Sequence, residues 1–127
     1  AGVAARLGSA KLIMEWVAAN RRDCETVILL GDFNAAQDEA SYQALVAPLA
    51  GGLASAIEIS ETPPFGPQGT FNGFDLLKSD SRAIDHIFVS AGVRVLKHGV
   101  ITHHRDGKLP SDHYPVIADL AISGCPA

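Results

Sequence analysis

Three short segments of this sequence place chemically active side chains directly beside apolar runs. They read GDFN at residues 31–34, IDHIF at 84–88 and SDHYPV at 111–116. A folded core can hold carboxylate, amide and imidazole groups at such positions against one another. Together these groups can orient water, bind a cation and stabilise charge on a phosphoryl group. The three segments therefore indicate a hydrolytic site for phosphate esters.

The first segment offers the groups that an attacking water needs. Asp32 can accept a proton from the water or orient it, and Asn34 can donate its amide N–H to a non-bridging phosphoryl oxygen. Gly31 follows an apolar run that would deliver these short side chains without a long, flexible arm. The alternative is an ordinary turn, since Gly, Asp and Asn are common turn residues. We predict catalytic roles for Asp32 and Asn34.

The second and third segments supply a carboxylate–histidine pair. Asp85 lies within an apolar run, where burying an unpaired carboxylate is unfavourable. His113 is the best candidate partner, because Asp85 would hold its imidazole in one tautomer and favour its protonated form. The alternative for residues 111–113 is a loop with a capping Asp and a solvated His. We predict catalytic roles for Asp85 and His113, and we predict that Asp112, a hard oxygen donor, binds Mg²⁺ or Mn²⁺.

Composition sets broad limits on the function. The chain has 127 residues and is 47% hydrophobic, which suits one domain or a piece of one. Its net charge of −4 argues against a strongly basic nucleic-acid groove. Cys24 and Cys125 match no zinc or redox spacing, so we interpret both as structural or incidental. No apolar run approaches the roughly 20 residues of a membrane span, and no signal peptide precedes Ala1, although an upstream targeting segment could be absent; localisation stays open.

The first elements that would position these groups follow from the apolar pattern. Residues 4–20 carry apolar side chains at helical spacing, widened by Leu12 and Trp16, and predict a helix with a broad buried face. Residues 26–30 form a continuous β-rich run. This run predicts a central strand that is covered on both sides and ended by Gly31.

The middle of the chain is more irregular. A second helix is predicted at residues 39–46, with Asp38 as its N-cap. The glycines at residues 51–52 indicate a turn, after which residues 53–59 fit either a strand or irregular structure. Residues 62–69 are rich in Pro and Gly and cannot form a regular ladder, so they predict an exposed loop.

The last third predicts strands. Residues 84–90 and 93–100 read as two strands joined by a tight turn at residues 91–92, which predicts a hairpin. Alternating apolar residues predict a final strand at residues 114–120, and Pro115 near its start indicates an edge or a strand end. Helices and strands in this order predict an α/β layered arrangement.

Other polar residues have simpler interpretations. His103 and His104, which one could combine with Asp106 and His98 into a metal cluster, lack a regular ligand spacing and predict a solvated loop. His86 is interpreted as a packed strand residue. Scattered basic residues can meet a phosphate-bearing substrate, although such residues are usually solvated surface. They are Lys78, Arg82 and Lys108.

The order of the three segments resembles the endonuclease/exonuclease/phosphatase superfamily, the DNase I-like metal-dependent phosphoesterases. In that superfamily the Asp and Asn of a G-D-x-N motif act on the water and the transition state, an Asp on a late strand orients a C-terminal His, and an S-D-H motif closes the site. The residues GTF at 69–71 also resemble a segment whose Thr often lies near the substrate, which implies substrate binding by Thr70. Residues 111–116 resemble the corresponding stretch of bacterial sphingomyelinases, although the overall pattern is nearer to small bacterial members.

This resemblance covers nearly the whole chain, from the first helix to Leu120. It implies that residues 1–127 are the C-terminal half of a single DNase I-like domain, an α+β two-sheet sandwich flanked by helices. It also implies a Mg²⁺- or Mn²⁺-dependent hydrolase whose substrate could be a nucleic acid, a phospholipid headgroup or a sugar phosphate. Family members take a metal-binding Glu and a substrate-positioning Asn and His from upstream. We therefore expect a missing N-terminal half or a homo-oligomer partner; the alternative is a catalytically incomplete, noncatalytic or self-associating module.

Overall fold

The computed structural model describes residues 2–47, 51–78 and 82–124 of the chain; Cys125 lies outside these ranges. Three helices and five strands are assigned within them. In chain order they are α1 Val3–Asn20, β1 Ile28–Asp32, α2 Ala40–Val46, β2 Ala54–Ser55, α3 Ala56–Ile59, β3 Asp85–Val89, β4 Arg94–Val100 and β5 Val116–Ala121.

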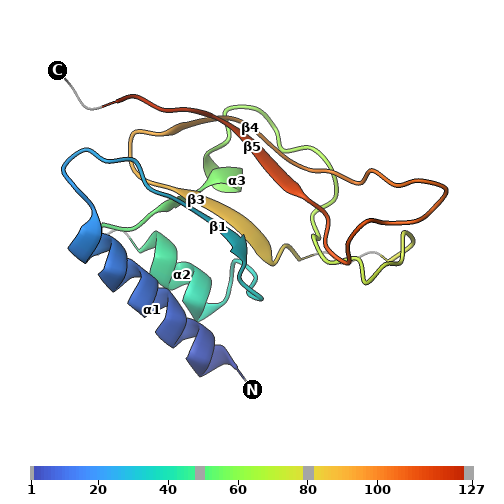
Figure 1. Cartoon of the computed structure of the whole chain (residues 1–127), viewed down its shortest axis with the longest axis horizontal. Coiled ribbons are helices and arrows are strands. Elements are labelled where there is room, and N and C mark those ends of the chain that lie inside the picture. The colour runs from blue at the N-terminus through green and yellow to red at the C-terminus, as the bar shows by residue number, and fades with distance from the viewer. Residues whose placement is uncertain (1, 48–50, 79–81, 125–127) are drawn as a thin grey trace.

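Two small antiparallel sheets form the framework. The first has the order β1-β3-β2, and the second pairs β4 with β5. Figure 1 shows α1 and α2 on one side of the β1-β3 ribbon and the β4-β5 pair on the other. The predicted mixed α/β layering is confirmed. None of the helices in the described ranges is long and apolar enough to cross a membrane.

Strand β3 is packed on both faces. On the helix side, Phe88 is fully buried with Tyr42 and Leu45, and its ring lies 5.2 Å from the ring of Phe33. On the other side, Val89 belongs to a second apolar cluster with residues of α3 and β4. Full burial of one such side chain contributes about 1.5–3 kcal/mol, so β3 anchors both layers.

Strand β1 lies at the edge of its sheet, which corrects the prediction of a central strand covered on both sides. It pairs with β3 alone in the described structure. Leu29 packs against the helix-side core, but the opposite face is open, with Leu30 65% exposed. The strand also begins at Ile28 and continues through Asp32, so Gly31 does not end it. A continuous apolar run is expected to be buried on both faces, but within the described residues no element packs over the Leu30 face of β1.

Strands β3 and β4 do not form the predicted hairpin. The turn at residues 91–92 passes the chain from the first sheet to the second instead. At the end of β3, Ser90 and Val27 exchange two hydrogen bonds: the Ser90 N–H donates to the Val27 carbonyl, and the Val27 N–H donates to Ser90 Oγ, each at 2.9 Å. Both edges of β3 are used by β1 and β2, so β4 has no edge to pair with.

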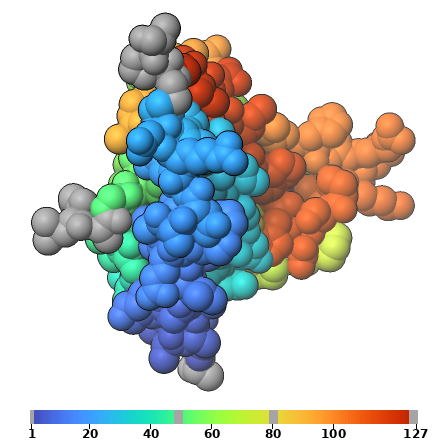
Figure 2. Space-filling view, turned by 60° about the vertical axis from the view of Figure 1, so that its left-hand side comes forward, coloured from blue at the N-terminus to red at the C-terminus, as the bar shows by residue number. Residues whose placement is uncertain are grey.

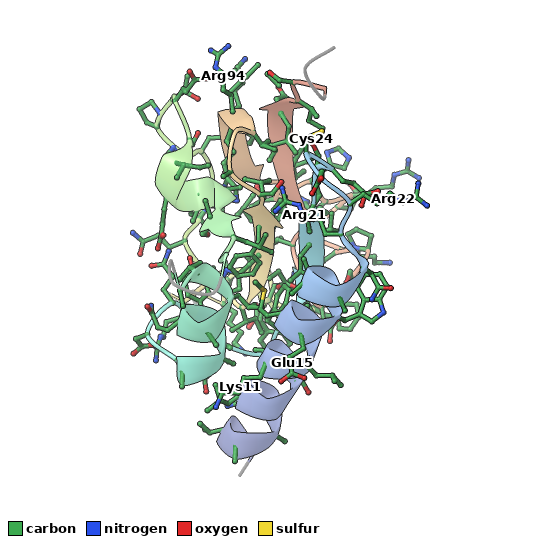
Figure 3. The ribbon with its side chains drawn as sticks, turned by 90° about the vertical axis from the view of Figure 1, so that its left-hand side faces the viewer. Lys11, Glu15, Arg21, Arg22, Cys24 and Arg94 are labelled. Carbon is green, nitrogen blue, oxygen red and sulfur yellow. The ribbon has the colours of Figure 1, made fainter. Side chains whose placement is uncertain are left out.

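Helix α1 has nearly the predicted bounds, but its buried face is narrower than predicted. Ala10 is buried, and Ile13 and Met14 pack against the core. Leu12 and Trp16 are each 66% exposed, because α2 and the sheet cover only one stripe of the helix. Lys11 and Glu15 of α1, which are labelled in Figure 3, are both exposed.

Of the remaining local predictions, the N-cap of α2 was wrong and the loop and final strand were correct. The N-cap of α2 is Glu39 and not Asp38, whose carboxylate pairs with Arg82. The turn after α2 is present at Gly51, which has a positive φ of 63°. The segment that fitted either a strand or irregular structure contains β2 followed by α3. The Pro/Gly-rich residues 62–69 form the predicted loop, exposed up to Gln68, and β5 alternates as predicted.

An open apolar face therefore runs along α1 and β1. We define it by Leu12 and Trp16 on α1 and by Ile28 and Leu30 on β1, all exposed. Trp16 and Ile28 line one common hollow, so the helix and strand parts of this face meet at these two residues, beside the free edge of β1. Figure 2 shows α1 in blue on this side of the molecule, with the C-terminal strand in red nearby. Exposed contiguous apolar surface beside an unpaired strand edge is typical of an interface.

We expect the isolated 127-residue chain to self-associate through the open face. Sedimentation velocity over a range of concentrations should show association, and Leu30→Lys should weaken it because a charge would be placed on the apolar strand face. Leu77→Lys is the matched control, since Leu77 is exposed but lies outside this face. A monodisperse monomer with ordinary cooperative thermal unfolding would contradict the expectation.

Candidate active site

The register of β1 and β3 brings two carboxylates together. Asp32, the last residue of β1, is the direct partner of Asp85, the first residue of β3. Directly opposed residues of an antiparallel pair point to the same face of the sheet. Two like charges in this position repel each other, so a positive group between them would be stabilising.

His113 lies beside both carboxylates. Its Nδ1–H donates a hydrogen bond to Asp85 Oδ2 at 2.8 Å, and its Nε2 lies 3.6 Å from Asp32 Oδ2. The contact that the sequence suggested between Asp85 and His113 is thus present. The arrangement also joins the first and third segments, about 80 residues apart in the chain.

A second strand-like contact fixes the position of His113. Phe71 and His113 form an isolated antiparallel bridge. On either side of it, the Tyr114 N–H donates to the Thr70 carbonyl and the Asn72 N–H donates to the Asp112 carbonyl, each at 2.7 Å. These backbone bonds hold the loop before β5 against residues 70–72, so the imidazole is positioned by a scaffold and not by a free loop.

The electrostatics of the site favour protonated His113. The hydrogen bond to Asp85 is the largest cause that raises its pKa above the ordinary value, and the charges of Asp85, Asp32 and Asp112 act in the same direction. Partial burial opposes them by disfavouring the charged form. The result is an imidazole whose protonated form is favoured beside two carboxylates, with Nδ1 bonded to Asp85 and Nε2 directed toward Asp32.

Asn34 lies in a turn directly after β1. Its φ of 49° is left-handed, a conformation that Asn adopts more readily than most residues. Its backbone N–H donates to Asp32 Oδ1 at 2.9 Å. Phe33 anchors the turn from inside through its ring contact with Phe88. The turn interpretation of this segment is therefore correct locally, and it does not conflict with a catalytic role for Asn34, which stays a prediction.

Thr70 is buried and links two parts of the site. Its Oγ1 accepts hydrogen bonds from the backbone N–H groups of Ile84 at 3.0 Å and Asp85 at 3.2 Å. Its side chain is only 1% exposed. These contacts position the start of β3; the substrate contact suggested for Thr70 stays a prediction.

A compact oxygen and nitrogen donor group fits a small cation. One ligand atom each of Asp32, Asp85 and His113 lies within 4.8 Å of the others. Carboxylate oxygens suit hard ions such as Mg²⁺ or Mn²⁺, which need about six donors. In this group His113 Nδ1 already engages Asp85, so a cation there would compete with that bond. Asp112 is not part of the group, and its predicted role as a metal ligand would leave the pair intact.

A hollow of about 300 Å³ opens beside the site. Asp32, Asp85 and His113 line one part of it, and Leu30 and Val116 line another. The hollow therefore connects the polar site with the open apolar face. Substrate, water or further protein can reach the carboxylates from this side.

Phe71 is a site residue that sequence reasoning did not single out. Its ring lies 5.3 Å from that of His113 in an edge-to-face contact, and Lys78 Nζ lies 4.2 Å from its centroid. Such contacts typically contribute about 0.5–1.5 kcal/mol and restrict the imidazole. The one available signal was the position of Phe71 directly after Thr70, which does not reveal the bridge to His113.

Two interpretations from sequence are confirmed: His86 is a packed strand residue, and His103 and His104 lie in an exposed loop. His86 is buried, its Nε2–H donates to the Ala35 carbonyl at 2.6 Å, and burial lowers its pKa. His98 is also buried with a lowered pKa. His103 and His104 are exposed, and the described residues contain no metal-binding group other than the one above.

Comparison with known proteins defines the class. Residues 2–113 match the model of the Endonuclease/Exonuclease/phosphatase family, and the chain belongs to that family. This is the family that the order of the three segments suggested. No curated protein is similar enough in sequence to count as a match.

Solved structures give the same fold at about half their length. A mannosyl-6-phosphatase from Bacteroides thetaiotaomicron is 37% identical with a TM-score of 0.80, and the match covers 92% of this chain and 46% of that one. An endonuclease/exonuclease/phosphatase family protein from the same species is 36% identical with a TM-score of 0.80, covering 94% and 46%. The human Nocturnin catalytic domain with bound sulfate, 18% identical at a TM-score of 0.70 and covering 97% and 43%, shares the fold alone. The chain thus spans less than half of these proteins; that it is the C-terminal half of one domain stays a prediction.

Replacing Asp85 by Asn in the metal-free chain should lower the pKa of His113, because the carboxylate charge that stabilises the imidazolium is lost. NMR titration of the imidazole resonances measures this directly. Asp112→Asn is the matched control and should lower that pKa less, since Asp112 is the smallest of the causes. Equal effects of the two substitutions would contradict the assigned geometry.

The Asp85–His113 pair should make the stability of the fold depend on pH. Because folding raises the pKa of His113, its protonation stabilises the fold fully below the unfolded value of about 6.5, and this contribution is lost as pH rises through the folded pKa. Chemical denaturation at several pH values should therefore show Asp85→Asn destabilising the chain more at pH 5 than at pH 9. A loss that is independent of pH would argue against the ion pair.

Proposed function

We propose that this chain carries one side of the active site of a divalent-metal-dependent hydrolase of phosphate esters. The observation that supports it best is the convergence of Asp32, Asp85 and His113 at the end of one strand pair. Family membership supports the same reaction class. In the complete protein, we propose a DNase I-like sandwich of two sheets flanked by helices.

Asp32 is assigned to the attacking water. Its side chain is 40% exposed, so water can reach it, while its Oδ1 is fixed by the Asn34 backbone. A carboxylate held in this way accepts a proton from water or orients it toward phosphorus. Asn34 then donates its side-chain amide to a non-bridging oxygen of the phosphoryl group.

His113 is assigned to the phosphoryl group and the leaving oxygen. Asp85 fixes its Nδ1, which leaves Nε2 available toward the reaction space beside Asp32. A protonated imidazole in this orientation donates a hydrogen bond to a phosphoryl oxygen or a proton to the leaving group. Asp85 acts through His113 and is a positioning residue.

The residues fit a hard divalent cation, although they supply only part of its coordination. Asp112 is a carboxylate donor of the type that Mg²⁺ and Mn²⁺ prefer. When bound, the cation would supply positive charge that polarises the phosphoryl group. The other donors would come from water, from the substrate and from protein outside this chain.

The relatives guide the choice of substrate. The structure that is 37% identical is named a mannosyl-6-phosphatase, which makes a hexose 6-phosphate a reasonable first test. The net charge of −4 also makes a nucleic-acid substrate less suitable than a small phosphate ester. The substrate role proposed for Thr70 is indirect, because its buried Oγ1 accepts hydrogen bonds from Ile84 and Asp85 and so positions the start of β3 beside the substrate.

A second candidate function rests on the length of the match. The chain covers 46% of the solved relative to which it is 37% identical, and the side chains of its open face are exposed. By itself, the chain would then be a noncatalytic or self-associating module. Both candidate functions would hold if the isolated chain is inactive and hydrolysis appears only when the rest of the domain is present.

In a polypeptide that carries the complete domain, Asp32→Asn and His113→Ala should each lower kcat by about 10²–10⁴-fold, because each removes a proton-transfer or charge-stabilising group. Chelation of divalent cations should abolish turnover, and added Mg²⁺ or Mn²⁺ should restore it. Phosphate release from a hexose 6-phosphate and from phenyl phosphate gives the measurement.

His104→Ala is the control for these substitutions, because His104 is an exposed loop histidine outside the site. It should leave kcat within about twofold, as expected for a surface substitution. Full activity of Asp32→Asn and His113→Ala would sink the assignment. The isolated 127-residue chain should show little or no turnover.

A further inference from the structure

A second pocket, distinct from the hollow at the carboxylates, lies beside the site. It has a volume of about 350 Å³, within the range of small-molecule pockets. We call it the side pocket. Its polar lining includes Asp38, Gln68 and Arg82, and its apolar lining includes Ile57.

The side pocket is built by the same segments as the site. Its lining residue Ala36 lies two positions after Asn34, Gln68 two before Thr70, and Ala83 two before Asp85. Two residues of chain span at most about 7 Å, so each segment takes the pocket lining close to the site.

Backbone contacts fix these three segments to one another. The Phe33 N–H donates to the Ile84 carbonyl at 2.9 Å, and the Ile84 N–H donates to Thr70 Oγ1 at 3.0 Å. The three segments therefore converge at Ile84. The side pocket is rigidly placed relative to the carboxylates and His113.

The chemistry of the side pocket suits hydroxyl groups. Asp38 and Arg82 form an ion pair in its lining, and Gln68 adds a carboxamide. Together they offer both donors and acceptors with no net charge, and a hydroxyl both donates and accepts. The ion pair is largely exposed, so its groups can exchange water for ligand hydroxyls with little loss of stability.

We propose that the side pocket binds the hydroxyl-rich alcohol portion of the substrate, so that the substrate class is the phosphate ester of a sugar or polyol. The inference rests on the proposed function, since the phosphoryl group must lie at Asp32 and His113. A pocket that holds one acidic and one basic side chain does not favour a long polyanion, which needs a continuous track of basic side chains. A purely apolar leaving group would cover Asp38, Gln68 and Arg82 without replacing their hydrogen bonds to water. The carbon face of a sugar would instead lie against the apolar part of the lining, while its hydroxyls reach the polar part; the apolar part is Ala36, Ile57 and Ala83.

The experiment compares two substrates in a polypeptide that carries the complete domain. A hexose 6-phosphate has hydroxyls for the side pocket, and phenyl phosphate has none. Gln68→Ala and Asp38→Asn should each lower kcat/KM for the hexose 6-phosphate by about three- to tenfold, mainly through KM, as expected for the loss of one hydrogen bond. Both should leave kcat/KM for phenyl phosphate within twofold, which also shows that the variants are folded.

Asn20→Ala is the matched control, because it removes an exposed carboxamide at the end of α1. It should change neither substrate. If wild-type protein hydrolyses phenyl phosphate in a manner that depends on Asp32, but Gln68→Ala and Asp38→Asn affect both substrates equally or neither, the side-pocket assignment is overturned while the proposed function stands. If wild-type protein hydrolyses neither ester, the proposed function fails and the side-pocket assignment fails with it.

Discussion

The burial of β3 between two apolar layers is the constraint on which the rest of this structure depends. His86 and Phe88 pack toward the helices, and Ile87 and Val89 pack toward the second sheet. A slip of one residue in register would exchange these two sets and move Asp85 to the apolar helix side. The register therefore places Asp85 at the start of β3, directly opposite Asp32 of β1. The site is built around this pair of carboxylates.

Electrostatics then explain why a histidine lies there. Two carboxylates whose oxygens come within 4.8 Å repel each other by between about 1 kcal/mol in water and about 4 kcal/mol near a protein surface. Protonation of His113 would relieve that repulsion, and a bound divalent cation would relieve it too. A cation that bound at the same carboxylate oxygens would compete with protonated His113. A separate ligand such as Asp112 would let the pair and the cation coexist.

Sequence reasoning succeeded where a residue carries its own constraint. An ionised carboxylate in an apolar run needs a partner, and this requirement alone indicates that Asp85 pairs with a histidine such as His113. Helix α1 and the Pro/Gly-rich loop at 62–69 follow equally from local chemistry. It failed for features decided by surfaces distant in sequence. The helical spacing of apolar residues shows that Trp16 could be buried, but it does not show whether another element covers it. Two strands that follow each other in sequence can likewise belong to different sheets, as β3 and β4 do. The bridge between Phe71 and His113 has no local signal at all.

Strand β1 belongs both to the exposed apolar face and to the candidate active site. It carries Asp32 at its end and the exposed Leu30 two residues earlier, and both line the same hollow with His113. Whatever covers Leu30 must therefore also border Asp32. Cover there would exclude water and strengthen the interactions among Asp32, His113 and a bound cation, because screening falls with the local dielectric. The exposed strand face and the polar site thus share one hollow, and any protein that buried Leu30 would also form a wall beside Asp32 and His113.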